Sequence, residues 1–353
     1  RRQILLAGGA LLLPASRRAF ASTPDDGASL VKQHATPLDD PWMVGHGVRA
    51  MGRGFTLGNG RRAVDHLLET VLATLPANDR TVLGFPLEIE VHPNMFLKTM
   101  LEAGVPLDHG FTHKGRRRTV QELVEGARAL IRPALVASSP NALPWSIIAL
   151  TRTTPPSRRQ WTNAWGESVD LDALVENGLR LLEEASLPVA QAMREGRPET
   201  RQAPVHGFTC GGGHMIYALL AAAHAGYPGK DRSRRRMQQQ VDLLVFRLGA
   251  DVDLIERFYR GRGKASADFW FELDAKLKLL GHAEECLAFA ALHKVATFTA
   301  AQRAQWQTAT ATLRRLLIDV EARGLEEARR LDHELYRQLV GDTCHARHGL
   351  TLT

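Results

Sequence analysis

Apolar residues recur at spacings of three and four along most of this 353-residue chain, and this period limits the folds that are open to it. One early segment places Val64, Leu67 and Val71 on a single helix face. A later segment begins at Thr119 and carries Glu122 three residues on, which is the pattern of a helix-starting capping box. A third begins after Ser168, which we expect to cap it. The pattern predicts about a dozen helices joined by Gly/Pro turns.

Strand signals are sparse. The best strand candidate is residues 81–93, where apolar residues alternate between prolines. We expect two helices broken near Gly281, and long final helices from about Thr299 to Val340. The predicted fold is all-α, built from antiparallel helical hairpins that most simply close into an (α/α) toroid or, alternatively, stay open as an α-solenoid. No linker divides residues 41–353, so we expect a single domain there.

The first 21 residues have the features of an export signal. They open on twin arginines, continue with a short apolar run and end in Ala19-Phe20-Ala21. This pattern resembles a twin-arginine-type signal peptide, and it predicts a periplasmic or extracellular protein without a transmembrane segment in the mature chain. Residues 22–40 are polar and predict a mobile leader.

Charge and missing motifs exclude several classes of function. The net charge is +7, but the basic residues form short scattered clusters without interleaved aromatic residues, so we expect no nucleic-acid partner. The chain has no Gly-rich phosphate loop, no Gly-x-Ser-x-Gly elbow and no Cys-x-x-Cys-His haem site. Nucleotide-driven chemistry, serine hydrolysis and c-type haem electron transfer therefore have no support in the sequence.

Two short segments concentrate cysteine and histidine. The first, HGFTCGGGHMIYALL, places Cys210 and His214 around three glycines at the start of a helix, and the second, DTCHARHGL, holds Cys344 and His345. Thiolate and imidazole are the usual ligands of zinc and also bind copper, so these four residues are the candidate metal ligands. A Cys210–Cys344 disulfide and inert buried thiols are the alternatives, and Cys286 is expected to lie in the core.

The candidate acid and base groups are His92, His282 and Glu285. His92 follows Glu88 and Glu90 at alternate positions, so all three could face one side of the chain. His282 and Glu285 lie three residues apart and share a helix face. Solvated edges and structural hydrogen bonds are the alternatives. Helix starts gather at the mouth of a toroid, and on that basis we expect one cavity lined by five residues: His46, His92, Cys210, His214 and His282.

These motifs carry three family resemblances. The sequence is similar to exported bacterial all-helical proteins with a Cys-Gly-Gly-[Gly/Thr]-His motif. The Gly281, His282 and Glu285 helix resembles that of the (α/α)-toroid sugar 2-epimerases. The Cys210 motif with Cys344 and His345 resembles the zinc site of the lanthionine cyclases, although here the Cys-His pair is followed by Ala346 in place of glycine.

Two functional hypotheses follow. In the first, the protein is an enzyme that acts on an extracytoplasmic carbohydrate or peptide through a His/Cys/Glu cavity that can hold a metal. In the second, it is a non-catalytic binding or structural protein whose fold is locked by the Cys210–Cys344 disulfide and whose cavity holds a small-molecule, glycan or peptide ligand.

Overall fold

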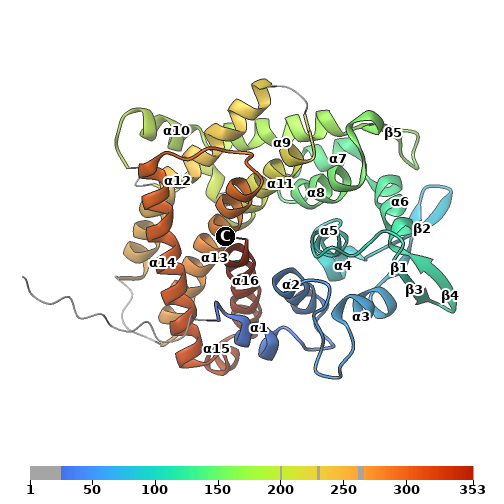
Figure 1. Ribbon diagram of the computed structural model, residues 1–353, viewed down its shortest axis with the longest axis horizontal. Helices are drawn as coiled ribbons and strands as arrows, with labels where there is room; N and C mark the ends of the chain where they lie inside the picture. Colours follow the sequence, from blue (N-terminus) through green and yellow to red (C-terminus); the bar gives the residue numbers. More distant parts are fainter. Residues whose placement is uncertain (1–24, 199–200, 229–230, 261–265, 353) are drawn as a thin grey trace, which may run out of the picture.

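A computed structural model describes residues 25–198, 201–228, 231–260 and 266–352. Within these ranges the protein is mostly helical, as the sequence predicts, with sixteen α-helices and six short strands (Figure 1). The first helices are α1 (Ala28–His34), α2 (Pro41–Met51), α3 (Ala63–Thr70), α4 (Leu87–Glu90), α5 (Met95–Glu102), α6 (Val120–Leu130), α7 (Pro133–Ala137) and α8 (Leu143–Thr153). The others are α9 (Leu171–Ala185), α10 (Leu187–Arg194), α11 (Gly213–His224), α12 (Asp231–Arg260), α13 (Ser266–Leu292), α14 (Ala300–Arg323), α15 (Glu326–Leu331) and α16 (His333–Thr351).

The strands form three separate antiparallel hairpins. They pair β1 (Ala73–Ala77) with β2 (Arg80–Gly84), β3 (Gly110–His113) with β4 (Arg116–Thr119), and β5 (Gln160–Thr162) with β6 (Ser168–Asp170). In Figure 1, β1–β4 lie at the edge of the molecule opposite α14. Each hairpin leads into a helix, so the strands serve as connections between helical layers.

Helices α13 and α16 form the centre of the helical packing, and they lie side by side in Figure 1. Glycine permits their close approach, because a Cβ on Gly349 would lie 2.7 Å from the backbone nitrogen of Glu285. Helix α2 packs on α16, while α11 packs against both α8 and α13. Segments from the first, middle and last thirds of the chain therefore meet around one pair of helices.

The predicted helix break near Gly281 is wrong, since α13 runs without interruption from Ser266 to Leu292. The physical reason is that Gly281 serves packing rather than a turn. A Cβ there would lie 3.1 Å from the backbone nitrogen of Ala346 on α16. His282 consequently lies in the middle of a helix and not at its start.

The strand predicted over residues 81–93 is only partly correct. Residues up to Gly84 belong to β2, but Leu87–Glu90 form the short helix α4, which begins after Pro86. Proline fixes its own φ and lacks a backbone donor, so it ends the strand and allows a helix to start.

Two helix starts test the predicted caps. The capping box of Thr119 and Glu122 is present at the start of α6, and the Thr119 backbone nitrogen donates to Glu122 at 3.1 Å. The predicted Ser168 cap is wrong, because Ser168 lies in β6. Asp170 caps α9 instead, and its carboxylate accepts from the Asp172 backbone nitrogen at 2.9 Å.

The segment predicted as a mobile leader contains an ordered helix. Residues 28–34 form α1, which packs against α16 with Val31 fully buried. This part of the leader prediction is wrong because Leu30 and Val31 supply an apolar face that α16 covers. The predicted signal peptide, residues 1–21, lies outside the described residues. Among the described helices, none combines the length and apolar composition needed to span a bilayer.

The close α13–α16 contact predicts how a Gly→Ala substitution changes the free energy of unfolding. Gly349→Ala should lower the free energy of unfolding by about 1–3 kcal/mol, because the added methyl group meets the backbone of α13. Gly249→Ala on α12 is the matched control, since a Cβ there has open space around it and should stabilise by about 0.5–1 kcal/mol. Urea unfolding of both variants measures this difference, and equal effects would contradict the packing argument.

Candidate metal centre and its cavity

A cavity of about 330 Å³ lies where α2, α5, α8, α11, α13 and α16 meet. All five residues for which the sequence predicts a shared cavity line it: His46, His92, Cys210, His214 and His282. His345 and Asp342 of α16 also line it, together with Trp42 and Trp145. The cavity wall is therefore rich in imidazole and aromatic rings.

The backbone before α11 explains the three consecutive glycines. Cys210 has φ 53° and ψ 43°, and Gly211 and Gly212 follow at φ 62° and 84°, so three residues in a row are left-handed. Gly212 and Gly213 also need to lack a Cβ, which would lie 2.8 Å from Val205 Cγ2 and from His282 Cβ, respectively. The left-handed conformation costs Cys210 on the order of 1–2 kcal/mol, a strain that is found mostly at functional sites.

Three ligand-type side chains converge at this turn. Cys210 Sγ and one ring nitrogen each of His214 and His282 all lie within 4.8 Å of one another. A second group, His282, Glu285 and His345, meets the same distance limit and shares His282 with the first. The ring centroids of His282 and His345 are 3.9 Å apart.

The protonation of these rings bears on what they can bind. Burial, with the nearby His282 and His345 rings, holds the pKa of His214 well below its usual range, so its ring is neutral and has a free lone pair. Burial alone would also lower the pKa of His282. The Cys210 sulfur and the Asp342 and Glu285 carboxylates outweigh it and raise that pKa well above its usual value.

His282 has a ring nitrogen that the protein leaves without a partner. Its Nε2 is buried and accepts or donates no hydrogen bond within the described structure, and Asp342 Oδ1 lies 3.6 Å away. Asp342 Oδ2 also lacks a hydrogen-bond partner. Buried polar atoms are rarely left without a hydrogen bond, but Lys278 Nζ lies 3.7 Å from Asp342 Oδ2 and compensates part of its charge.

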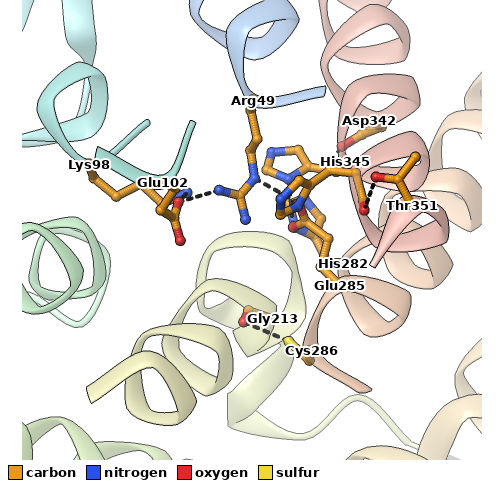
Figure 2. A network of polar contacts seen from close by, with 11 residues as sticks. Arg49, Lys98, Glu102, Gly213, His282, Glu285, Cys286, Asp342, His345 and Thr351 are labelled. Atoms are coloured by element: carbon orange, nitrogen blue, oxygen red, sulfur yellow. Dashed lines mark hydrogen bonds and ion pairs between the residues drawn. The ribbon is translucent and has the colours of Figure 1, made fainter. Parts of the chain in front are cut away.

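Glu285 holds the side chains around it in place through several buried contacts (Figure 2). Its carboxylate lies 2.8 Å from His345 Nδ1, 2.7 Å from His348 Nδ1 and 2.7 Å from Arg49 Nε, and its side chain is only 2% exposed. A carboxylate can only accept here, so Nδ1 of each histidine must donate. Burial holds the pKa of His345 well below its usual range, so this donation leaves its Nε2 as a lone-pair donor.

Arg49 links this group to a second buried carboxylate. Its guanidinium pairs with Glu102 of α5 as well as with Glu285, and Lys98 Nζ lies 2.8 Å from Glu102 (Figure 2). Burial would raise the pKa of Glu102, but Arg49 and Lys98 lower it to about 2. Burial, with the Arg49 charge, lowers the pKa of Lys98 to about 8.

Aromatic rings form the other wall of the cavity. The His92 ring is stacked on Trp145 with centroids 3.8 Å apart and an angle of 11°. His46 Nδ1 donates to the Trp42 carbonyl at 2.7 Å, and burial lowers its pKa to about 4. Both histidines are thus held in fixed positions, and flat apolar faces line the space beside the cysteine and histidine cluster.

The structure brings together three of the four predicted metal ligands. Cys210, His214 and His345 all line the cavity, whereas Cys344 does not. Cys344 is one residue before His345 on α16 and points into the core, where it is 0% exposed. All three cysteines are free thiols, so the alternative of a Cys210–Cys344 disulfide is not formed. Cys286 lies in the core, as expected, and donates to the Gly213 carbonyl at 3.3 Å.

The three acid and base candidates occupy different places. His282 and Glu285 do share a face, with Nδ1 and Oε2 3.6 Å apart, but His92 stacks on Trp145, and Trp145 lies between it and His214. The expected common face of Glu88, Glu90 and His92 is wrong. Helix α4 turns both glutamates towards a separate, largely apolar cavity, and His92 lines the site cavity.

The sequence reasoning missed Arg49, Lys98 and Asp342. Lys98 and Asp342 lie three residues from buried apolar side chains of their own helices, which is the available signal for a buried charge. Arg49 lacks even this signal, because glycine, histidine and arginine occupy the positions three and four residues away. The sequence does not identify its partner either, because Arg49 and Glu285 are 236 residues apart in the chain.

Comparisons of the chain with protein-family models, with curated proteins and with solved structures found no match. The geometry of the site itself therefore carries the functional argument.

The buried pairing of Glu102 predicts how stability depends on pH. Its pKa in the folded protein, about 2, is below the ordinary value of 4.5. The stabilisation that it provides is therefore fully present above about pH 4.5 and is lost as the pH falls towards 2. Glu102→Gln should cost about 3–5 kcal/mol near neutral pH, because Lys98 loses its buried partner and Arg49 loses one of two, and the cost should shrink steadily below pH 4.5.

Urea unfolding from pH 7 to pH 3 measures this cost. Glu184→Gln is the matched control, since Glu184 pairs with Arg180 on an exposed helix face and should change stability little at any pH. A Glu102→Gln cost that stays constant across this range would show that the carboxylate charge contributes nothing.

Proposed function

We propose that this protein is a metal-dependent enzyme, in which Cys210, His214 and His282 hold one zinc-type ion at the end of the 330 Å³ cavity. The observation that carries the proposal is the convergence of these three ligand atoms within 4.8 Å, next to a cavity wall. Catalytic zinc sites use three protein ligands and leave one position open to water or substrate. His345 lies beside the cluster and can serve as a further ligand or as a general base. Glu285 accepts a hydrogen bond from its Nδ1 and so orients its Nε2.

The surroundings suit hydrolytic chemistry. A bound zinc ion lowers the pKa of a coordinated water to near 7 and polarises a carbonyl oxygen. The Glu285–His345 pair resembles the carboxylate–histidine arrangement that orients metal ligands in other proteins. The stacked His92 and Trp145 rings provide a flat surface against which a substrate can lie. The expected substrate is an extracytoplasmic carbohydrate or peptide.

The finer fold and the location are part of the same proposal. Helices α1 and α2 pack against the last helix, α16, so the two ends of the helical array meet, which favours the (α/α) toroid over an open solenoid. The twin-arginine pattern of residues 1–21 supports export to the periplasm or the cell exterior.

A cysteine-dependent acyl-transfer enzyme is the second candidate. Two observations favour it: Cys210 is held in a strained left-handed conformation, and it lies beside His282, whose raised pKa favours an imidazolium ion. If zinc-free protein kept full activity on its substrate and lost it when Cys210 was alkylated, the cysteine would be the nucleophile and not a ligand.

Metal content tests the main proposal. Purified protein should hold about one equivalent of zinc, and Cys210→Ser should weaken zinc binding by more than the roughly 10- to 100-fold that losing an outer partner costs. Because zinc displaces the proton on His282, affinity should also fall as the pH is lowered. Elemental analysis and a competition titration with a chelator measure both effects.

Cys286→Ser is the matched control, since it replaces the same atom type in the core next to α11. It should leave the zinc affinity unchanged. Equal zinc content in all three proteins, or none in any of them, would overturn the metal assignment.

A further inference from the structure

A second cavity, of about 500 Å³, lies on the other side of Cys210, between α12 and α13. Two residues, Cys210 and Lys278, line both this groove and the site cavity. The two spaces therefore adjoin at these two side chains. A substrate whose reacting group lies at the cysteine and histidine cluster can extend past Lys278 into the groove.

The groove is mostly apolar, although Gln202, His206, Asp251 and Asp274 also line it. Helix α12 contributes Leu254, Ile255 and Phe258, and α13 contributes Phe271 and Leu279. Phe258 is 55% exposed and Phe271 is 40% exposed, so two large aromatic side chains meet water on the same groove. Exposed apolar surface gathered in one concave place, next to a site, indicates a binding role.

Charge limits what the groove can hold. Its charged groups pair with one another, Asp251 with His206 at 2.9 Å and Asp274 with Lys278 at 3.1 Å, so the groove offers little net charge to an ionic arm. Lys278 Nζ lies at the junction of the two cavities, 3.1 Å from Asp274 Oδ2 and 2.9 Å from Gln338 Oε1. Its ammonium group can reach a neutral carbonyl oxygen at this junction.

From this geometry we infer that the groove is the side-chain subsite of a peptide-class substrate, which holds a large apolar side chain next to the reacting bond. This inference rests on the proposed function for the position of the reacting bond. It selects a peptide over a glycan, because Asp251 and Asp274 are already paired with His206 and Lys278. The rings of Phe258 and Phe271 offer carbon surface and no partners for sugar hydroxyl groups.

The test uses the zinc-loaded full chain and three probes: acetyl-Ala-Phe-Ala-amide, acetyl-Ala-Ser-Ala-amide and a tri-N-acetylglucosamine glycan. Isothermal titration calorimetry should show that the Phe peptide binds about 10- to 100-fold more tightly than the Ser peptide, which is the effect expected from burying one aromatic side chain. Phe271→Ser should reduce this preference several-fold without changing the zinc content. Leu187→Ser, at a similarly exposed apolar residue on α10, should leave it unchanged.

Equal binding of the two peptides, no binding of either at millimolar concentration, or tighter binding of the glycan would overturn the subsite. A Phe271→Ser protein that changes from dimer to monomer but keeps the Phe preference would instead make the groove an interface between copies. The proposed function fails separately, by the absence of zinc. If the protein holds no zinc but still prefers the Phe peptide, the subsite is supported and the metal site is wrong. If it binds zinc but shows no Phe preference, the metal site is supported and the subsite is wrong.

Discussion

The buried ion pair between Arg49 and Glu285 is the interaction on which the rest of the site depends. Both side chains are nearly inaccessible to water, so each charge must be compensated by the other or the fold loses several kcal/mol. Arg49 comes from α2 and Glu285 from α13, and the same guanidinium reaches Glu102 of α5. One residue thus joins three helices from distant parts of the sequence, and none of these charges can be buried until the helices have packed.

This pair also determines the state of the histidines. Glu285 accepts from His345 and His348 of α16, which fixes Nδ1 of each ring as the donor and leaves the other nitrogen free. The close α13–α16 contact at Gly349 makes these short distances possible. The core therefore fixes the positions of the candidate ligands on α13 and α16, and Cys210 precedes them in a left-handed turn. A site of this kind is preorganised, since little movement is needed for the side chains to hold an ion.

The sequence allowed part of this to be predicted. Helical periodicity identified a mostly helical fold, and the capping pattern at Thr119 is confirmed at α6. The sequence places three glycines between Cys210 and His214, and the structure explains them by the positive φ angles of Gly211 and Gly212 and by the contact of Gly213 with His282. What could not be predicted depends on contacts between distant segments. Gly281 breaks no helix because α16 packs over it, and Cys344 points away from the cavity although its neighbour His345 faces it.

Zinc K-edge X-ray absorption of the purified protein tests the central claim most directly, because it reports the atoms bound to the metal. We expect one sulfur ligand at about 2.3 Å together with two or three nitrogen or oxygen ligands at about 2.0–2.1 Å. The sulfur contribution should disappear in Cys210→Ser and persist in Cys286→Ser. A zinc environment of oxygen and nitrogen alone in the unmodified protein would contradict the assignment of Cys210 as a ligand.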